Sequence, residues 1–204
     1  MNNVCNKHFK CAKVTFFLHI AKRNAQKCRC VYENRSKFKN YTYLCRVKDK
    51  EKTVRVMKRI LFVCHGNICR SPMAEFVMKD LVAKAGREKD FYIESAATST
   101  EEIGNAVYPP ARRKLAEHGI RCDGKTARQM TRRDYERFDY IVGMDQWNLR
   151  NMRRLCDDDP EGKIHLLMDF TKRPSDVADP WYTGDFDATW RDVLEGCQAL
   201  LEIL

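Results

Sequence analysis

The chain has 204 residues and a formal net charge of +10, a balance that by itself favours an acidic partner such as a nucleic acid. The excess is confined to residues 1–56, which hold 15 Lys and Arg against 3 Asp and Glu, a net charge of +12. Residues 57–204 hold 23 against 25, a net charge of −2, so nucleic-acid binding is not expected of the larger part.

Residues 1–56 also differ from the rest in composition. They contain no Gly or Pro and five of the ten cysteines, which do not show the paired spacing of a zinc site. Their longest apolar stretch, residues 14–20, is much shorter than the about 20 residues that span a bilayer, and no small-residue cleavage site follows it. We interpret this segment as a basic extension that is disordered or that comes from a mis-assigned upstream start. An extension that binds membranes or RNA is the alternative.

The most informative segment follows the apolar run of residues 60–63, which predicts a buried strand. Eight residues beginning with Cys64 read CHGNICRS, and Pro72 then opens a helix predicted over residues 73–85. Backbone N–H groups of such a loop converge on one point, where the helix dipole adds positive charge, so the loop suits a phosphate. The same field favours a thiolate at Cys64. The planar guanidinium of Arg70 is able to hold two phosphoryl oxygens at once.

The other loop residues are expected to shape this site. Gly66 permits close approach of the backbone, and Asn67 tolerates a positive φ. Ser71 is placed to donate its hydroxyl proton to the Cys64 sulfur or to cap the helix, and the two roles are compatible. His65 tunes the sulfur or, as we favour, faces solvent. Substrate or phosphate binding is expected for the loop residues as a group: His65, Gly66, Asn67, Ile68, Cys69 and Ser71.

Strand and helix patterns alternate through the rest of the chain. Strands are predicted over residues 91–96, 139–145 and 164–168, and helices over residues 111–118, 147–155 and 186–204. This alternation implies an α/β fold, a three-layer sandwich in which helices cover both faces of a four-stranded parallel sheet. Ligands of such sheets bind beyond the carboxyl ends of the strands, where the Cys64 loop is expected.

Residues 119–126, GIRCDGKT, match the nucleotide-binding pattern GxxxxGK[ST]. A nucleotide-binding loop of this kind follows a buried strand and opens a helix. Residues 119–126 instead follow directly on a predicted helix, so we do not assign nucleotide binding to them.

A second motif lies far downstream, where residues 179–182 read DPWY. Together with Cys-x5-Arg-Ser, it makes residues 57–204 resemble the low-molecular-weight protein tyrosine phosphatases. The resemblance implies a flavodoxin-like, phosphotyrosine phosphatase I-like fold and hydrolysis of phosphotyrosine through a phosphocysteine, without a metal or organic cofactor. It also implies the catalytic roles: Cys64 is the nucleophile, Arg70 neutralises the phosphoryl oxygens, and Asp179 protonates the phenolate and then activates water.

The resemblance further implies that Cys69 is a redox partner, because members with this second cysteine close a disulfide to the nucleophile under oxidant. Cys122, Cys156 and Cys197 are scattered without a disulfide framework, so we expect a reducing, cytoplasmic compartment. The implied partner is a phosphotyrosine-containing protein or peptide, with no nucleic acid and no membrane. The expected oligomeric state is a monomer or a weak dimer.

Two positions depart from the better-known members of this family. Many members have a His two residues before an Ala-Arg pair, where it joins a hydrogen-bond network with the loop Asn and a Ser; here that residue is Lys125. Animal members carry an aromatic wall residue after the second strand, whereas residues 100–102 here read Thr-Glu-Glu. Trp181 and Tyr182 are left to stack against a phenyl ring of the substrate or to pack beneath the loop.

Three other functions fit this pattern less well. Arsenate reductases share the fold and the thiol loop, but they need extra thiols in relay, and Cys69 is too close in sequence to Cys64 to be a separate relay pair. Protein arginine phosphatases carry Thr just before the second loop cysteine, where Ile68 offers only an apolar wall, better suited to an aromatic ring. A catalytically silent phosphate-binding module does not require all three catalytic residues. The sequence therefore favours a protein tyrosine phosphatase.

Overall fold

The computed structural model describes residues 57–204, and the basic extension expected for residues 1–56 lies outside the described residues. At its centre is one sheet of four parallel strands in the order β2-β1-β3-β4. The strands are β1 (Lys58–Cys64), β2 (Phe91–Ala97), β3 (Tyr140–Gly143) and β4 (Ile164–Leu166). Each strand lies within or around one of the apolar runs that predicted it.

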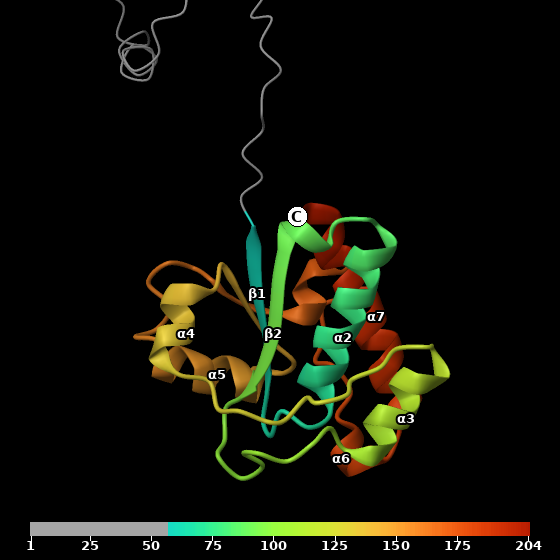
Figure 1. Cartoon of the computed structure of the whole chain (residues 1–204). Helices are drawn as coiled ribbons and strands as arrows, with labels where there is room; N and C mark the ends of the chain where they lie inside the picture. The colour runs from blue at the N-terminus through green and yellow to red at the C-terminus, as the bar shows by residue number, and fades with distance from the viewer. Residues whose placement is uncertain (1–56) are drawn as a thin grey trace, which may run out of the picture. The chain divides into compact units, whose positions relative to one another are not determined.

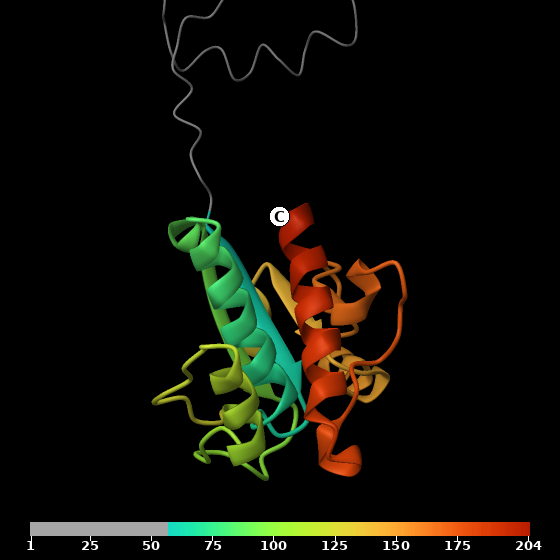
Figure 2. The same ribbon diagram turned by 90° about the vertical axis from the view of Figure 1, so that its right-hand side faces the viewer.

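Helices cover both faces of the sheet and so complete three layers (Figure 1). One face carries α2 (Arg70–Lys84), α3 (Pro109–Glu117) and α7 (Phe186–Ile203), and Figure 2 shows α2 and α7 side by side. The other face carries α4 (Arg132–Arg137) and α5 (Gln146–Leu155). Within residues 57–204, no helix is both long and apolar enough to cross a membrane. The predicted three-layer α/β sandwich around a parallel sheet is confirmed.

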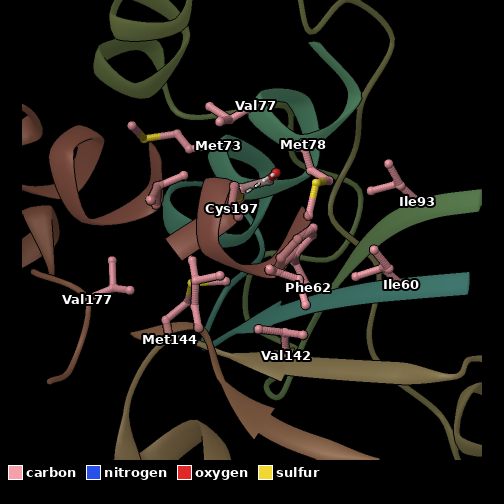
Figure 3. Packing of buried hydrophobic residues seen from close by; sticks show 14 of the residues in the cluster. Ile60, Phe62, Met73, Val77, Met78, Ile93, Val142, Met144, Val177 and Cys197 are labelled. Carbon is pink, nitrogen blue, oxygen red and sulfur yellow. Dashed lines mark hydrogen bonds between the residues drawn. The ribbon is translucent and has the colours of Figure 1, made fainter. Parts of the chain in front are cut away.

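β1 is buried on both faces because it lies inside the sheet. Ile60 and Phe62 belong to the core shared with α2 and α7, whereas Leu61 belongs to the core beneath α4 and α5. Figure 3 shows the first of these cores, where Phe62 of β1 lies near Met78 of α2 and Cys197 of α7. A strand buried on both sides needs apolar residues at successive positions, which is why the sequence shows an unbroken apolar run here.

The helix after the thiol loop begins earlier than the sequence indicates. The pattern predicts residues 73–85, whereas α2 starts at Arg70, so Ser71 and Pro72 lie in its first turn. The expectation that Ser71 caps this helix is therefore wrong. The residue at the cap is Cys69, which makes no side-chain capping hydrogen bond. A first turn that no side chain closes suits a helix terminus that binds an anion.

The shortest elements have no clear signature in the sequence. They are α4, α6 (Pro180–Thr183) and two 3-10 helices, η2 (Glu88–Asp90) and η3 (Leu167–Phe170). Elements this short do not extend over the turns needed to recognise a helical period. The fourth strand is also shorter than predicted. It ends at Leu166, because η3 begins within the apolar run of residues 164–168.

The segment that matches a nucleotide-binding pattern, residues 119–126, follows α3 without an intervening strand. Gly119 and Gly124 both have a φ of +74° and form turns. No helix starts directly after the segment in the described part of the chain. The structural context of a nucleotide-binding loop is therefore missing, as expected from the sequence.

Gly196 of α7 packs so closely on Leu167 that a Cβ built there lies 2.5 Å from Leu167 Cγ. We expect Gly196→Ala to lower the free energy of unfolding by about 1–3 kcal/mol, because overpacking a core costs that much. Without the clash, Ala would instead stabilise the helix by about 1 kcal/mol. Urea denaturation measures whether the substitution lowers or raises the free energy of unfolding. In a Leu167→Ala background the same substitution should be neutral or stabilising, and destabilisation there would contradict this packing.

Candidate active site

The loop of residues 65–69 lies at the carboxyl end of β1, between the neighbouring strands, and leads directly into α2. It is at the lower end of the molecule in Figure 1, where β1 ends and α2 begins. The Thr98 N–H donates to the Cys64 carbonyl at 2.8 Å and the Ser99 N–H to the His65 carbonyl at 3.0 Å, which ties the loop to the segment after β2. Open α/β sheets bind their ligands at this edge.

Cys64 ends β1 with its sulfur facing two hydrogen-bonding groups. The Asn67 N–H donates to Cys64 Sγ at 3.3 Å, and Ser71 Oγ lies 3.1 Å from the sulfur. Because Asn67 Nδ2 donates to Ser71 Oγ at 2.9 Å, the Ser71 hydroxyl proton remains available for the sulfur; the alternative acceptor, the Ala96 carbonyl, is farther away at 3.4 Å. A sulfur that receives two donated protons is suited to carry negative charge.

Asn67 fixes the shape of the loop. Its φ is +58°, the left-handed conformation that the sequence led us to expect of this residue. Its side chain is buried and fully engaged: Nδ2 donates to Ser71 Oγ and to Ser95 Oγ (2.8 Å), and Oδ1 accepts from the Arg128 N–H at 3.2 Å. Asn67 and Ser71 thus lie beneath the loop and support it, rather than facing the cavity as phosphate-binding side chains.

A buried carboxylate extends this support into the fold. Ser95 Oγ donates to Glu75 Oε2 at 2.5 Å, and Glu75, only 3% exposed, pairs with Lys125 Nζ at 3.0 Å and Lys79 Nζ at 2.5 Å. Lys125 Nζ also donates to the Ser95 carbonyl at 3.0 Å. The role of Glu75 was not predicted, although a charged residue among the apolar positions of a helix is the signal for a buried ion pair. Lys125, flagged as a departure from the family, is one of its two cationic partners.

Arg70 is buried and held from two sides. Its Nη1 lies 2.6 Å from Asp145 Oδ2, and its Nη2 lies 2.6 Å from Asp179 Oδ2. Burial lowers the pKa of Arg70, but the charges of Cys64, Asp179 and Asp145 outweigh burial and raise that pKa above its ordinary value. The guanidinium is therefore a permanent, oriented cation next to the sulfur.

The two carboxylates that hold Arg70 both start helices. Asp179 caps α6, accepting from the Trp181 N–H at 3.0 Å, and Asp145 caps α5, accepting from the Asn148 N–H at 2.7 Å. Asp179 is brought to the loop as the sequence motif predicted. Asp145 was missed, although an acidic residue between a strand and a helix at the same sheet edge is a signal that points to the site.

A cavity of about 190 Å³ opens above the sulfur. It is lined by residues of the loop, of the segment after β2 and of α6: Cys64, His65, Gly66, Ile68, Cys69, Arg70, Glu101, Glu102, Asp179, Trp181 and Tyr182. The structure therefore brings together the predicted site residues other than Asn67 and Ser71. Within residues 57–204, no group of three or more His, Cys, Asp or Glu side chains is arranged to hold a metal ion.

The aromatic residues of the predicted site stand at the mouth of the cavity. Trp181 is 58% exposed and Tyr182 is 86% exposed, so neither packs beneath the loop. The ring of Tyr108, which the sequence analysis did not single out, lies 5.6 Å from that of Trp181 and supports it. These rings offer a surface for an aromatic group of a substrate.

Cys69 lies in the loop with its thiol buried. Burial, together with the charges of Cys64 and Asp179, raises the pKa of Cys69 to about 12. Cys69 therefore stays a neutral thiol near neutral pH. All five cysteines of residues 57–204 are free.

A comparison with known proteins agrees with this geometry. The family model described as "Low molecular weight phosphotyrosine protein phosphatase" matches residues 59–204. The chain belongs to the low-molecular-weight protein tyrosine phosphatase family. The resemblance that the two motifs indicated is thereby confirmed.

Members of this phosphatase family align with nearly their whole length. The "Low molecular weight protein-tyrosine-phosphatase YfkJ" of Bacillus subtilis is 40% identical over 147 residues, 71% of this chain and 94% of the relative. The Gallus gallus phosphatase is 40% identical over 151 residues, 72% and 95% of the two chains. The crystal structure of YfkJ has a TM-score of 0.70 at 39% identity, covering 72% and 94% of the chains. The Drosophila arginine phosphatase structure has a TM-score of 0.66 at 32% identity, covering 72% and 97%.

In this low-molecular-weight phosphatase, Lys125 should matter more for stability than Lys79, although both pair with Glu75. The Lys125 side chain is 13% exposed and that of Lys79 is 42% exposed. We expect Lys125→Met to lower the free energy of unfolding by about 2–3 kcal/mol, because it weakens the pairing of a buried charge. The matched variant Lys79→Met should cost about 1 kcal/mol or less. Urea unfolding followed by Trp fluorescence tests this, and equal losses would contradict it.

Proposed function

We propose that the chain hydrolyses phosphotyrosine in proteins, and simple aryl phosphates, through a phosphocysteine intermediate. The observation that supports this most directly is one cavity with Cys64 at its floor and with Arg70 and Asp179 beside it. Membership of the low-molecular-weight protein tyrosine phosphatase family supports the same reaction.

In the proposed first step, Cys64 Sγ attacks phosphorus, an S–P bond forms and the bond from phosphorus to the phenolic oxygen breaks. Arg70 and the N–H groups of the loop bind the non-bridging oxygens. Asp179 gives its proton to the departing phenolate. In the second step Asp179 accepts a proton from water, the water oxygen attacks phosphorus, and the S–P bond breaks, which releases inorganic phosphate and returns Cys64 to the thiolate.

The ion pair between Arg70 and Asp179 has to open before Arg70 Nη2 is available to the substrate. Arg70 Nη2 donates to Asp179 Oδ2, while Asp179 Oδ1 stays fixed by the Trp181 N–H. We infer that a phosphoryl oxygen replaces Asp179 on Nη2 when substrate binds. The carboxyl group then remains at the cavity, tethered by its second oxygen, and is free to face the leaving group.

Cys64→Ser should reduce hydrolysis of an aryl phosphate to background, because a serine hydroxyl is not ionised at neutral pH.

Asp179→Ala should reduce kcat for phenyl phosphate by about 100-fold or more, the usual contribution of general acid catalysis. It should reduce kcat for p-nitrophenyl phosphate less, because that leaving group departs without a proton. Steady-state kinetics on both substrates measure the difference.

Circular dichroism and urea unfolding serve as controls that both variants fold. Residual turnover near the wild-type level in Cys64→Ser would remove Cys64 as the nucleophile. Equal losses on the two substrates in Asp179→Ala would remove Asp179 as the general acid while leaving the nucleophile unaffected.

For the substrate, we propose phosphotyrosine rather than phosphoarginine. Ile68 is buried at the cavity wall and offers no hydrogen bond, and Trp181 and Tyr182 are placed to contact an aromatic ring. A guanidinium group in contact with an apolar wall leaves hydrogen-bonding capacity unmet.

We expect the wild-type protein to cleave a phosphotyrosine peptide at least about tenfold faster than a matched phosphoarginine peptide, since polar groups without a hydrogen-bond partner lower kcat/KM for the substrate that carries them. Ile68→Thr should shift this ratio toward phosphoarginine, because a threonine hydroxyl offers a hydrogen bond. The kcat/KM values of the two peptides measure the ratio. A wild-type preference for phosphoarginine would overturn the tyrosine assignment and leave the three catalytic roles standing.

We further propose that residues 57–204 form the phosphatase domain and that it acts in the cytoplasm on a phosphotyrosine-containing protein, as a monomer or weak dimer. The free cysteines of this part of the chain support a reducing compartment. The position of Cys69 in the same cavity as Cys64 supports a redox role. In that role it attacks an oxidised Cys64 sulfenic acid and forms a disulfide with loss of water.

A further inference from the structure

The cavity above the thiol loop has two walls of different chemistry. One wall is aromatic and is formed by Trp181 and Tyr182. The other contains two adjacent carboxylates, Glu101 and Glu102, in the segment that follows β2. The floor, with Cys64 and Arg70, independently indicates a phosphorylated ligand.

The two carboxylates are available to a ligand. The Glu101 side chain is 71% exposed, and its partner is the similarly exposed ring of His65, with Nε2 at 3.1 Å. Glu102 Oε2 accepts a hydrogen bond from Asn105 Nδ2 at 2.6 Å, a neutral group. In the part of the chain that the structure describes, neither carboxylate forms an ion pair with Lys or Arg. Both negative charges are left for whatever enters the cavity.

The acidic wall is built into the site. A Cβ placed on Gly66 would lie 3.1 Å from Glu102 Cγ, so the Glu102 side chain rests against the phosphate loop itself. The backbone around it is held as well: the Asn105 N–H donates to the Glu102 carbonyl at 2.9 Å, and the Gly104 N–H donates to the Ala127 carbonyl at 2.9 Å. The fold thereby holds the backbone of Glu102 next to the phosphate loop.

The charge of the lining does not balance that of a phosphate. Among the cavity-lining residues Arg70 is the single cation that is always charged, whereas Glu101 and Glu102 add two carboxylates besides the general acid Asp179. Arg70 is in addition held by Asp145 from below. A phosphate group brings further negative charge into this lining. Arg70, the N–H groups of the loop and the helix dipole act on the phosphate, whereas Glu101 and Glu102 are left for cations of the substrate that lie next to the phosphotyrosine and reach the rim.

We propose that Glu101 and Glu102 are specificity-determining residues that select phosphotyrosine peptides with Lys or Arg next to the phosphotyrosine. This inference rests on the proposed phosphatase function and adds the class of substrate to it. The phenyl ring lies along the aromatic wall, and the flanking cations face the acidic wall. A peptide with acidic flanks places like charges at the rim and is disfavoured.

Two peptides that differ only in their flanks test this: one with Lys on both sides of the phosphotyrosine and one with Glu on both sides. At low ionic strength and pH 7, we expect kcat/KM to favour the basic peptide by about tenfold, since each exposed charge pair is worth a factor of a few. The preference should shrink at about 0.5 M salt, where such pairs are screened.

The double variant Glu101→Gln/Glu102→Gln should reduce this preference to about twofold or less, because both pairs are lost. Charge reversal in Glu101→Lys/Glu102→Lys should invert it. The matched control is Glu88→Gln/Glu202→Gln, which removes the same charge from exposed positions at the opposite end of the molecule, near the start of β2 and the end of α7 (Figure 1). It should keep the wild-type preference.

Hydrolysis of p-nitrophenyl phosphate, which has no flanking residues, measures the phosphatase activity separately from the preference for flanking charge. If wild type hydrolyses p-nitrophenyl phosphate but treats the two peptides alike or prefers the acidic one, the inference is overturned and the phosphatase function stands. If the control variant loses the preference as fully as the Glu101/Glu102 variant, overall charge and not this wall is responsible, and the inference is likewise overturned. If wild type hydrolyses none of the three substrates, the proposed function itself is overturned and the inference with it.

Discussion

The buried guanidinium of Arg70 connects the parts of this molecule on which the site depends. Arg70 is the first residue of α2, next to Cys64 at the end of β1. Its guanidinium forms ion pairs with Asp145, which follows β3, and with Asp179, at the start of α6. A cation buried in this way is tolerated only when it is paired from more than one side. The requirement to pair Arg70 therefore places Asp145 and Asp179, and with them two helix starts, around the thiol loop.

A second constraint comes from beneath the loop. The left-handed Asn67 is held through Ser95 to Glu75, whose charge is balanced by Lys125 and Lys79. A buried polar network of this kind stabilises a structure only if each member is satisfied, and here its members have partners on α2, β2 and the segment before α4. The conformation of the loop is thus coupled to the packing of α2 on the sheet, so that the sulfur keeps its hydrogen-bonding geometry.

The strands and long helices could be predicted from the sequence because their apolar residues repeat over enough positions to show a period. The unbroken apolar run before Cys64 identified an interior parallel strand, and the pattern of residues 186–204 identified the terminal helix, α7. The start of α2 and the end of β4 were misplaced by a few residues, since their local sequence also suits the neighbouring conformation. The four-residue α6 had no period to detect, although it carries the aromatic wall.

The sequence by itself indicated the chemistry of the site. A cysteine, an arginine and a helix start within one short loop predict a phosphate-binding nucleophile, and the resemblance to the phosphatase family implies a proton donor in the downstream Asp-Pro motif. The tertiary structure decided which other charges meet there. Asp145 and the pair Glu101–Glu102 lie far apart in the sequence, and each has a local explanation, as a helix cap or as surface residues. Only the packing of strands in the order β2-β1-β3-β4 brings their segments to one sheet edge, because parallel strands place their carboxyl ends side by side whatever their separation along the chain.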